Sequence, residues 1–239
     1  MLPEARAVLA QINRLQEVAR QAEQGEAGHL RIAVTMSVAF IQAFTRATKA
    51  FQSDYPGIVL ELVQGNSVQA IEALRQHKVD ICLIRPVSFR LPGFDQMTVI
   101  RDRLMLVLPS DHPEAAAENV SLSKLAEERF ILFRGEQKTA LHGQIMDVWA
   151  RAGLTPRVVL QAWNGFAILT LVAAGFGNGI LPSLLSGIHM PNVVWKNIDM
   201  DEQWTSSSIV MTYRTEAPNE KILSRFVNYI QQYSSETGR

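Results

Sequence analysis

Strands and helices alternate along this chain from Leu30 onward, and that order constrains the fold more than any other feature of the sequence. A first series contains LRIAV, a helix through Phe51, IVLELV, a short helix through Leu74, and VDICLI. A second series of the same kind begins at RFILF and continues through VVL and GNGIL. Continuous apolar strands separated by helices are typical of parallel sheets that are buried on both faces. The sequence therefore predicts two successive α/β units.

Two regions fit this scheme less simply. MTVIRDRLMLVLP is interpreted as two strands split by the charged residues 101–103. Near the end of the chain, SSSIVMTYR indicates one more strand, and Ile222, Phe226 and Ile230 mark one face of a final amphipathic helix. The residues alone do not decide which of the two units takes the additional strand.

The N-terminal segment has a helical period. Its apolar residues recur at steps that alternate between three and four, as the a and d positions of a heptad repeat do. They are Ala5, Val8, Ile12, Leu15 and Ala19. Such a helix could pack on its own domain or extend as a solvated leader, but the strict alternation favours a helix–helix seam. We therefore predict a dimerisation helix over residues 1–28.

Charge and composition argue against several functions. The chain has 23 Lys and Arg against 23 Asp and Glu, for a formal net charge of zero, whereas proteins that bind a phosphate backbone carry a basic surplus. The histidines lack the i, i+2 or i, i+4 spacing of metal ligands. No phosphate-binding loop, dinucleotide fingerprint or nucleophile elbow occurs. We expect no metal, no cofactor and no enzymatic activity.

Location follows from similar arguments. The single cysteine, Cys82, lies in the apolar run VDICLI, where it is expected to be a buried hydrophobic residue. It cannot form an intrachain disulfide, which fits a reducing compartment. No run of residues is apolar enough to span a membrane, and the N-terminus is too polar for a secretory signal. The prediction is a cytoplasmic protein without membrane contact.

Small polar residues gather where the predicted strands end. In open α/β sheets, ligands bind beyond the carboxyl ends of the strands, where helix N-termini present free N–H groups. These positions hold Thr35, Ser37, Asn66, Ser67 and Arg85 in the first unit, and Phe133, Arg134, Trp163 and Asn164 in the second. The hydroxyl and amide side chains could be no more than helix N-caps. The two arginines suit an anionic ligand, but either could belong to a structural ion pair.

With these features the chain resembles the effector-binding, or regulatory, domain of LysR-type transcriptional regulators. The resemblance is carried, in order, by QAEQGEAGHLRIAV, FQSDYPGIVLELVQGNSVQAIEALRQHKVDICLI, VIRDRLMLVLPSDHP and LVAAGFGNGILPS. It implies a type II periplasmic-binding-protein-like α/β fold, with two α/β subdomains joined by two crossover strands and preceded by an amphipathic linker helix. Subdomain I then comprises residues 30–102 and 208–239, and subdomain II comprises residues 103–207.

The resemblance also implies a function, namely the ligand-sensing and oligomerisation portion of such a regulator. A small organic effector, anionic and with an aromatic ring as one option, would bind in the cleft between the subdomains. Carried over residue by residue, its contacts include the strand-end residues named above together with Phe176 and Asn178. The linker helix would pair two copies into a homodimer, with a tetramer as a further option. The family's winged helix-turn-helix is missing ahead of this helix, so DNA would be bound only through that missing module.

Two other classes of protein remain as alternatives. A solute-binding protein of a transport system shares the implied fold, but the absence of a signal sequence and the heptad helix count against it. An enzyme on the same fold would need a nucleophile, a metal or an acid–base pair, and the sequence presents none of these.

Overall fold

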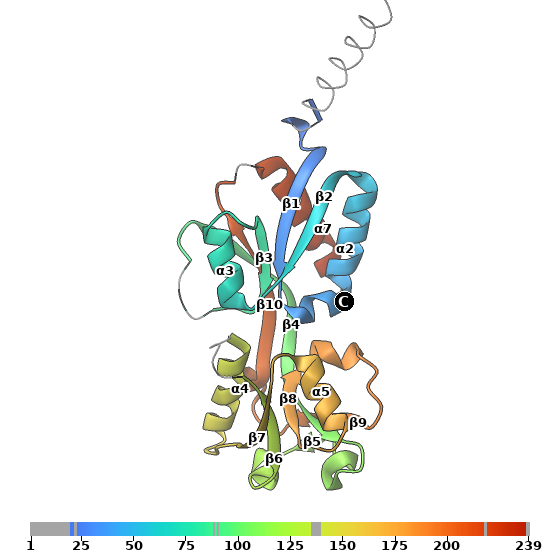
Figure 1. Ribbon diagram of the computed structural model, residues 1–239, viewed down its shortest axis with the longest axis vertical. Helices are drawn as coiled ribbons and strands as arrows, with labels where there is room; N and C mark the ends of the chain where they lie inside the picture. The colour runs from blue at the N-terminus through green and yellow to red at the C-terminus, as the bar shows by residue number, and fades with distance from the viewer. Residues whose placement is uncertain are drawn as a thin grey trace, which may run out of the picture.

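The computed structural model describes residues 20–21, 23–87, 89, 91–134, 140–217 and 219–237, which form two lobes arranged end to end (Figure 1). The predicted dimerisation seam, Ala5, Val8, Ile12, Leu15 and Ala19, lies outside the described residues. Within the described part of the chain, no helix is both long enough and apolar enough to cross a membrane.

The first lobe is built on three parallel strands. Its elements are β1 (Ala27–Val34), the 3-10 helix η1 (Met36–Phe40), α2 (Gln42–Asp54), β2 (Gly57–Gln64), α3 (Ser67–Arg75), β3 (Ile81–Ile84) and the C-terminal α7 (Glu220–Thr237). β1 pairs in parallel with both β2 and β3, as the alternation of strands and helices predicts. α2 and α7 pack together, with the rings of Phe51 and Phe226 edge to face at 5.2 Å. The C-terminal helix α7 therefore completes the hydrophobic core of the first lobe.

The second lobe repeats the α/β pattern around a different core. Its elements are η2 (Pro113–Ala116), β5 (Asn119–Val120), η3 (Leu122–Leu125), β6 (Arg129–Phe133), α4 (Ala140–Arg151), β7 (Arg157–Ala162), α5 (Gly165–Ala173), β8 (Gly179–Pro182), η4 (Ser183–Gly187), β9 (Val193–Ile198) and α6 (Glu202–Thr205). β6 and β7 pair in parallel. Trp149 of α4 is fully buried with its ring edge to face against Phe130, at 4.7 Å. Each lobe thus has a hydrophobic core of its own.

Two long antiparallel strands, β4 (Phe94–Pro109) and β10 (Ser206–Arg214), connect the lobes (Figure 1). The prediction of two strands split at residues 101–103 is wrong, because β4 is continuous. The charges fit inside a strand since successive side chains point to opposite faces: Arg101 and Arg103 are exposed, whereas Asp102 is buried. β10, the strand that the residues alone could not assign, pairs with β3 of the first lobe as well as with β4.

β2 corrects a second expectation, that the strands would be buried on both faces. β3 is fully buried, but β2 lies at the end of the strand order of the described residues, where it pairs with β1. Val59 and Leu62 are 54% and 52% exposed there. An apolar run of residues cannot by itself separate a central strand from an edge strand whose second face is open. The first lobe therefore presents apolar side chains along its sheet edge.

Candidate functional site

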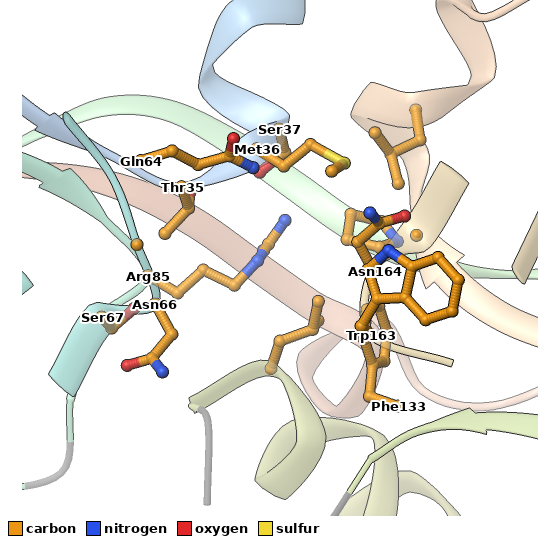
Figure 2. A pocket seen from close by; sticks show the side chains of 15 residues that line it. Thr35, Met36, Ser37, Gln64, Asn66, Ser67, Arg85, Phe133, Trp163 and Asn164 are labelled. Carbon is orange, nitrogen blue, oxygen red and sulfur yellow. The ribbon is translucent and has the colours of Figure 1, made fainter. Parts of the chain in front are cut away.

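A cavity of about 370 Å³ is lined by residues of both lobes (Figure 2). The first lobe contributes Thr35, Met36, Ser37, Gln64, Gly65, Asn66, Ser67 and Arg85, and the second contributes Phe133, Leu141, Trp163, Asn164, Gly165, Pro182 and Leu185. Most of the residues predicted from the strand ends are therefore brought together in one place. A volume of this size suits a small organic molecule.

Parallel pairing explains why residues so far apart in the sequence meet here. β1 pairs in parallel with both β2 and β3, so the carboxyl ends of all three strands lie at one edge of the sheet. The backbone N–H of Thr35 donates to the Leu83 carbonyl at 3.1 Å, and that of Gly65 donates to the Val34 carbonyl at 3.1 Å. In the second lobe, β6 and β7 likewise end together, at Phe133 and next to Trp163.

Helix N-termini from the two lobes meet at the cavity. α3 begins at Ser67 behind a capping box, in which Asn66 Oδ1 accepts from the Gln69 N–H at 2.9 Å. α5 begins at Gly165, where Asn164 Oδ1 accepts from the Ala167 N–H at 2.8 Å. Asn66 and Asn164 therefore act as N-caps of α3 and α5, which is the capping role that the sequence left open for such side chains. The first backbone N–H groups of a helix have no partner within that helix. The helix dipole also places partial positive charge at its N-terminus.

Arg85 lines the cavity and is also a member of a buried ion pair. Its Nη2 donates to Asp102 Oδ2 at 2.9 Å, and the two side chains are 3% and 0% exposed. Its Nη1 donates to Ser207 Oγ. Burial lowers the pKa of Arg85, and the charge and hydrogen bond of Asp102 oppose that shift. Arg85 is therefore part of a structural ion pair in which Asp102 balances its charge, and its side chain also lines the cavity.

The same ion pair extends into the second lobe. Asp102 Oδ1 accepts from Ser183 Oγ at 2.6 Å and from the Leu184 N–H at 3.2 Å. Ser207 Oγ donates to Gln144 Oε1 of α4 at 3.0 Å. A polar network thus joins the end of β3, both crossover strands and two elements of the second lobe, and its member Arg85 lines the cavity.

The cavity also contains an unsatisfied hydroxyl group and apolar surface. Thr35 Oγ1 is buried without a hydrogen-bond partner among the described residues, an arrangement that carries a free-energy cost. Trp163 is 77% exposed although it is a large aromatic residue, and it lines the cavity together with Phe133. Figure 2 shows both aromatic side chains on the side of the cavity opposite Thr35 and Asn66. The cavity is therefore polar toward the first lobe and aromatic toward the second.

Three predicted residues do not line this cavity. Arg134 is exposed and follows β6, with its N–H donating to the Ala162 carbonyl at 3.0 Å. Phe176 and Asn178 lie at the opposite end of β6, because Asn178 forms a parallel bridge with Phe130 and its N–H donates to the Arg129 carbonyl. The turn that holds Phe176 and Asn178 precedes β8, and the bridge to Phe130 is parallel. The turn therefore lies beside the start of β6, whereas the cavity lies beside its end. The structure therefore does not bring Phe176 and Asn178 to the cavity between the lobes.

Some lining residues were missed in the sequence. Gln64 and Pro182 are the last residues of β2 and β8, so the strand-end argument could have found them. Met36 stands between Thr35 and Ser37 directly after β1, so the same argument applies to it. Leu141 and Leu185 carry no such signal, because apolar side chains on helices are ordinarily assigned to the core. In the described part of the chain, no group of three or more His, Cys, Asp or Glu side chains is placed to hold a metal ion.

Comparison with known proteins agrees with this architecture. The uncharacterized HTH-type transcriptional regulator YnfL of Escherichia coli (strain K12) is 32% identical over 195 residues, which cover 81% of this chain and 65% of YnfL. The BenM effector binding domain with its effector benzoate has a TM-score of 0.75 at 20% identity, covering 88% of this chain and 93% of that one. The Synechocystis PCC6803 CcmR regulatory domain in complex with 2-PG has a TM-score of 0.77 at 20% identity, covering 87% of this chain and 97% of that one.

Two lobes joined by two crossover strands, with a cavity between them, define a type II periplasmic-binding-protein-like domain of the kind found in LysR effector-binding domains. Residues 23–235 match the LysR substrate binding domain family, and the chain belongs to that family. It spans 65% of the length of YnfL.

Proposed function

We propose that this chain is the effector-sensing part of a LysR-type transcriptional regulator and that it binds a small organic anion in the cavity between its lobes. The observation that carries the proposal is the meeting of the α3 and α5 N-termini, from opposite lobes, at one cavity. A ligand bound there contacts both lobes at once. Its affinity then depends on how the lobes are placed, which is the requirement for a sensor.

Several features favour an anion with an apolar part. Helix N-termini are anion-binding sites, because their N–H groups and dipole favour negative charge. The Thr35 hydroxyl has no hydrogen-bond partner among the described residues and can donate to a ligand oxygen. Phe133 and Trp163 offer aromatic surface for a ring or a hydrocarbon portion. Benzoate bound to BenM and 2-PG bound to CcmR are consistent with such a ligand.

The two crossover strands transmit the effect of ligand binding from the cavity to the placement of the lobes. Arg85 lines the cavity and is bonded to Asp102 of β4 and Ser207 of β10. A ligand that favours one arrangement of the lobes shifts that equilibrium only by its difference in affinity for the two arrangements. Movement about β4 and β10 would then alter contacts between copies of the chain.

Self-association and DNA binding belong to the same proposal. The heptad pattern of residues 1–28 favours pairing of two chains, and the exposed apolar edge at Val59 and Leu62 offers a further contact surface. The relative YnfL is named as an HTH-type regulator. In this proposal a helix-turn-helix module binds the DNA and this domain does not. The regulator then acts in the cytoplasm.

A matched pair of variants tests the cavity. Thr35→Val removes this hydroxyl with almost no change in shape. Thr48→Val removes another buried hydroxyl, in α2 and outside the cavity, that likewise has no hydrogen-bond partner in the described part of the chain. Neither variant should lower the free energy of unfolding, because neither hydroxyl loses a hydrogen bond to any residue that the structure describes. Benzoate, shikimate and 2-PG are titrated into each protein by calorimetry.

At least one of these anions should bind the parent chain. Thr35→Val should weaken that binding by about fivefold to tenfold, the equivalent of one hydrogen bond. Thr48→Val should leave it unchanged. Equal affinity in all three proteins would refute the assignment of Thr35, and a lack of binding by all three anions would refute the proposed ligand class.

A further inference from the structure

A second polar pocket, of about 420 Å³, lies in the first lobe at the opposite end of β3 from the cavity described above. It is lined by His29, Arg31, His77, Asp80, Arg214 and Asn219. These residues are absent from the lining of the cavity between the lobes. The four-residue strand β3 separates Asp80 from Arg85, so the two pockets share a strand but occupy different edges of the sheet.

Sheet topology brings the charged residues together. β3 lies between β1, which is parallel to it, and β10, which is antiparallel. The carboxyl end of β10, with Arg214, therefore lies beside the amino end of β3, where Asp80 stands. The backbone N–H of Asp80 donates to the Arg31 carbonyl at 2.8 Å, which places the third charged residue at the same edge.

Charge in this pocket is not balanced. Asp80 accepts from the Arg31 N–H at 2.8 Å, from Nε at 3.3 Å and from Nη2 at 3.2 Å, so it is committed mainly to Arg31. Arg214 Nη2 lies 3.6 Å from Asp80 Oδ1. Two guanidinium groups thus share one carboxylate, and the lining residues carry one positive charge in excess even with both imidazoles neutral. A partly buried cation without its own counter-ion is costly and attracts an anion.

Hydrogen-bonding capacity is also left over. Arg31 is 38% exposed, and its Nη1 has no partner in the described part of the chain. Arg214 Nη1 donates to the Leu74 and Val79 carbonyls, at 2.6 and 3.2 Å, while its Nε is buried and unpaired within the same described residues. Asn219 Oδ1 is likewise buried without a partner there. The Arg31–Asp80 contact connects β1 to the start of β3. That structural role does not use Arg31 Nη1, Arg214 Nε or Asn219 Oδ1.

Two imidazoles complete the pocket. His29 and His77 are exposed and make no side-chain hydrogen bond among the described residues. His77 follows α3 by two residues and lies in the left-handed region, with φ of 56° and its N–H donating to the Leu74 carbonyl. A residue other than glycine is uncommon in that conformation. The backbone there fixes an imidazole at the edge of a pocket that already has excess positive charge.

We propose that this second pocket binds a small phosphate-class oxyanion, independently of the ligand between the lobes. Guanidinium groups match phosphate oxygens in geometry and charge, and each imidazole can donate one further hydrogen bond. The Asn219 oxygen can accept from a hydroxyl group of the same ligand. The volume leaves room for a phosphorylated small molecule and is larger than inorganic phosphate requires.

The test follows the histidine side chains by NMR during a titration with inorganic phosphate at constant pH and ionic strength. Phosphate is raised to about 20 mM, above the millimolar Kd expected of a single phosphate group. The imidazole signals of His29 and His77 should shift and saturate together, whereas those of His112, His142 and His189 should not. Unsaturable shifts, equal shifts at all five histidines, or the same shifts with chloride would overturn the proposal.

Variants make the result specific. Arg31→Gln should weaken phosphate binding about tenfold or more, because it removes a charge-assisted contact. His77→Asn keeps a side chain that tolerates the left-handed conformation, so it should fold and still weaken binding. His189→Gln, outside the pocket, should bind as the parent does. Unchanged affinity in His77→Asn and in a folded Arg31→Gln would show that phosphate binds elsewhere.

Discussion

Loss of the charge on Asp102 should destabilise the fold far more than loss of an exposed charge. Asp102 accepts four hydrogen bonds, from Arg85 Nη2, the Arg103 N–H, Ser183 Oγ and the Leu184 N–H. In Asp102→Asn, one side-chain oxygen remains and the other position becomes an NH₂ group. If the oxygen keeps the three contacts of Oδ1, the NH₂ group faces Arg85, so two donors meet and the cation is buried without a counter-charge.

The expected magnitude follows from this burial. Removing one partner of a buried ion pair costs about 3–5 kcal/mol in the free energy of unfolding. For a chain of this length, that is a fall in Tm of about 10 °C. Arg85→Met should cost a similar amount, because it leaves the Asp102 carboxylate buried without a cation. The double variant should be more stable than the sum of the single changes predicts, with a coupling of about 2 kcal/mol.

Urea unfolding followed by circular dichroism measures these differences, with equal m values required for the comparison. The control is Lys124→Met, which breaks the more exposed pair with Glu114 and should cost less than about 1 kcal/mol. If Asp102→Asn and Arg85→Met each cost no more than this control, the buried network does not hold the lobes as described.

The remaining predictions concern single residues. Gly177→Ala should lower Tm by about 5 °C in a thermal scan, because a Cβ there would lie 2.6 Å from the Arg129 carbonyl oxygen; an unchanged Tm contradicts that packing. Burial raises the pKa of the Cys82 thiol to about 12, so a thiol reagent should label it only as fast as the chain unfolds, and prompt labelling of the native chain argues against burial. The hydrogen bond to Asp54 raises the pKa of Tyr229 to about 12, above that of an unfolded tyrosine. Its stabilising contribution is therefore complete below about pH 10 and lost as the pH rises toward 12; Asp54→Asn should move the tyrosinate absorbance step to lower pH, and an unmoved step contradicts the bond.

The alternation of strands and helices predicts two α/β units with parallel strands. Parallel pairing brings Thr35, Asn66 and Arg85 to one edge of the sheet. These contacts depend on the local order of elements, which a sequence displays directly. The capping roles of Asn66 and Asn164 follow from their position immediately before a helix.

Features that depend on distant neighbours were not accessible in the same way. β2 and β3 are similarly apolar, and only the strand order distinguishes the edge strand from the central one. Asp102 lies inside a strand where its charge predicts an interruption, because the partners that balance it lie 17 and 81 residues away along the chain. Asn178 lies away from the cavity because its turn precedes a parallel strand, and the cavity forms where such strands end. In each case the deciding contact is nonlocal.

Hydrogen–deuterium exchange with a bound anion gives the most direct test of a ligand site shared by both lobes. With an anion that binds the parent chain in calorimetry, amides at the start of α3, residues 67–69, and at the start of α5, residues 165–167, should gain protection together. Protection confined to one lobe, or absent from both helix starts, would contradict a ligand that bridges the lobes at these N-termini.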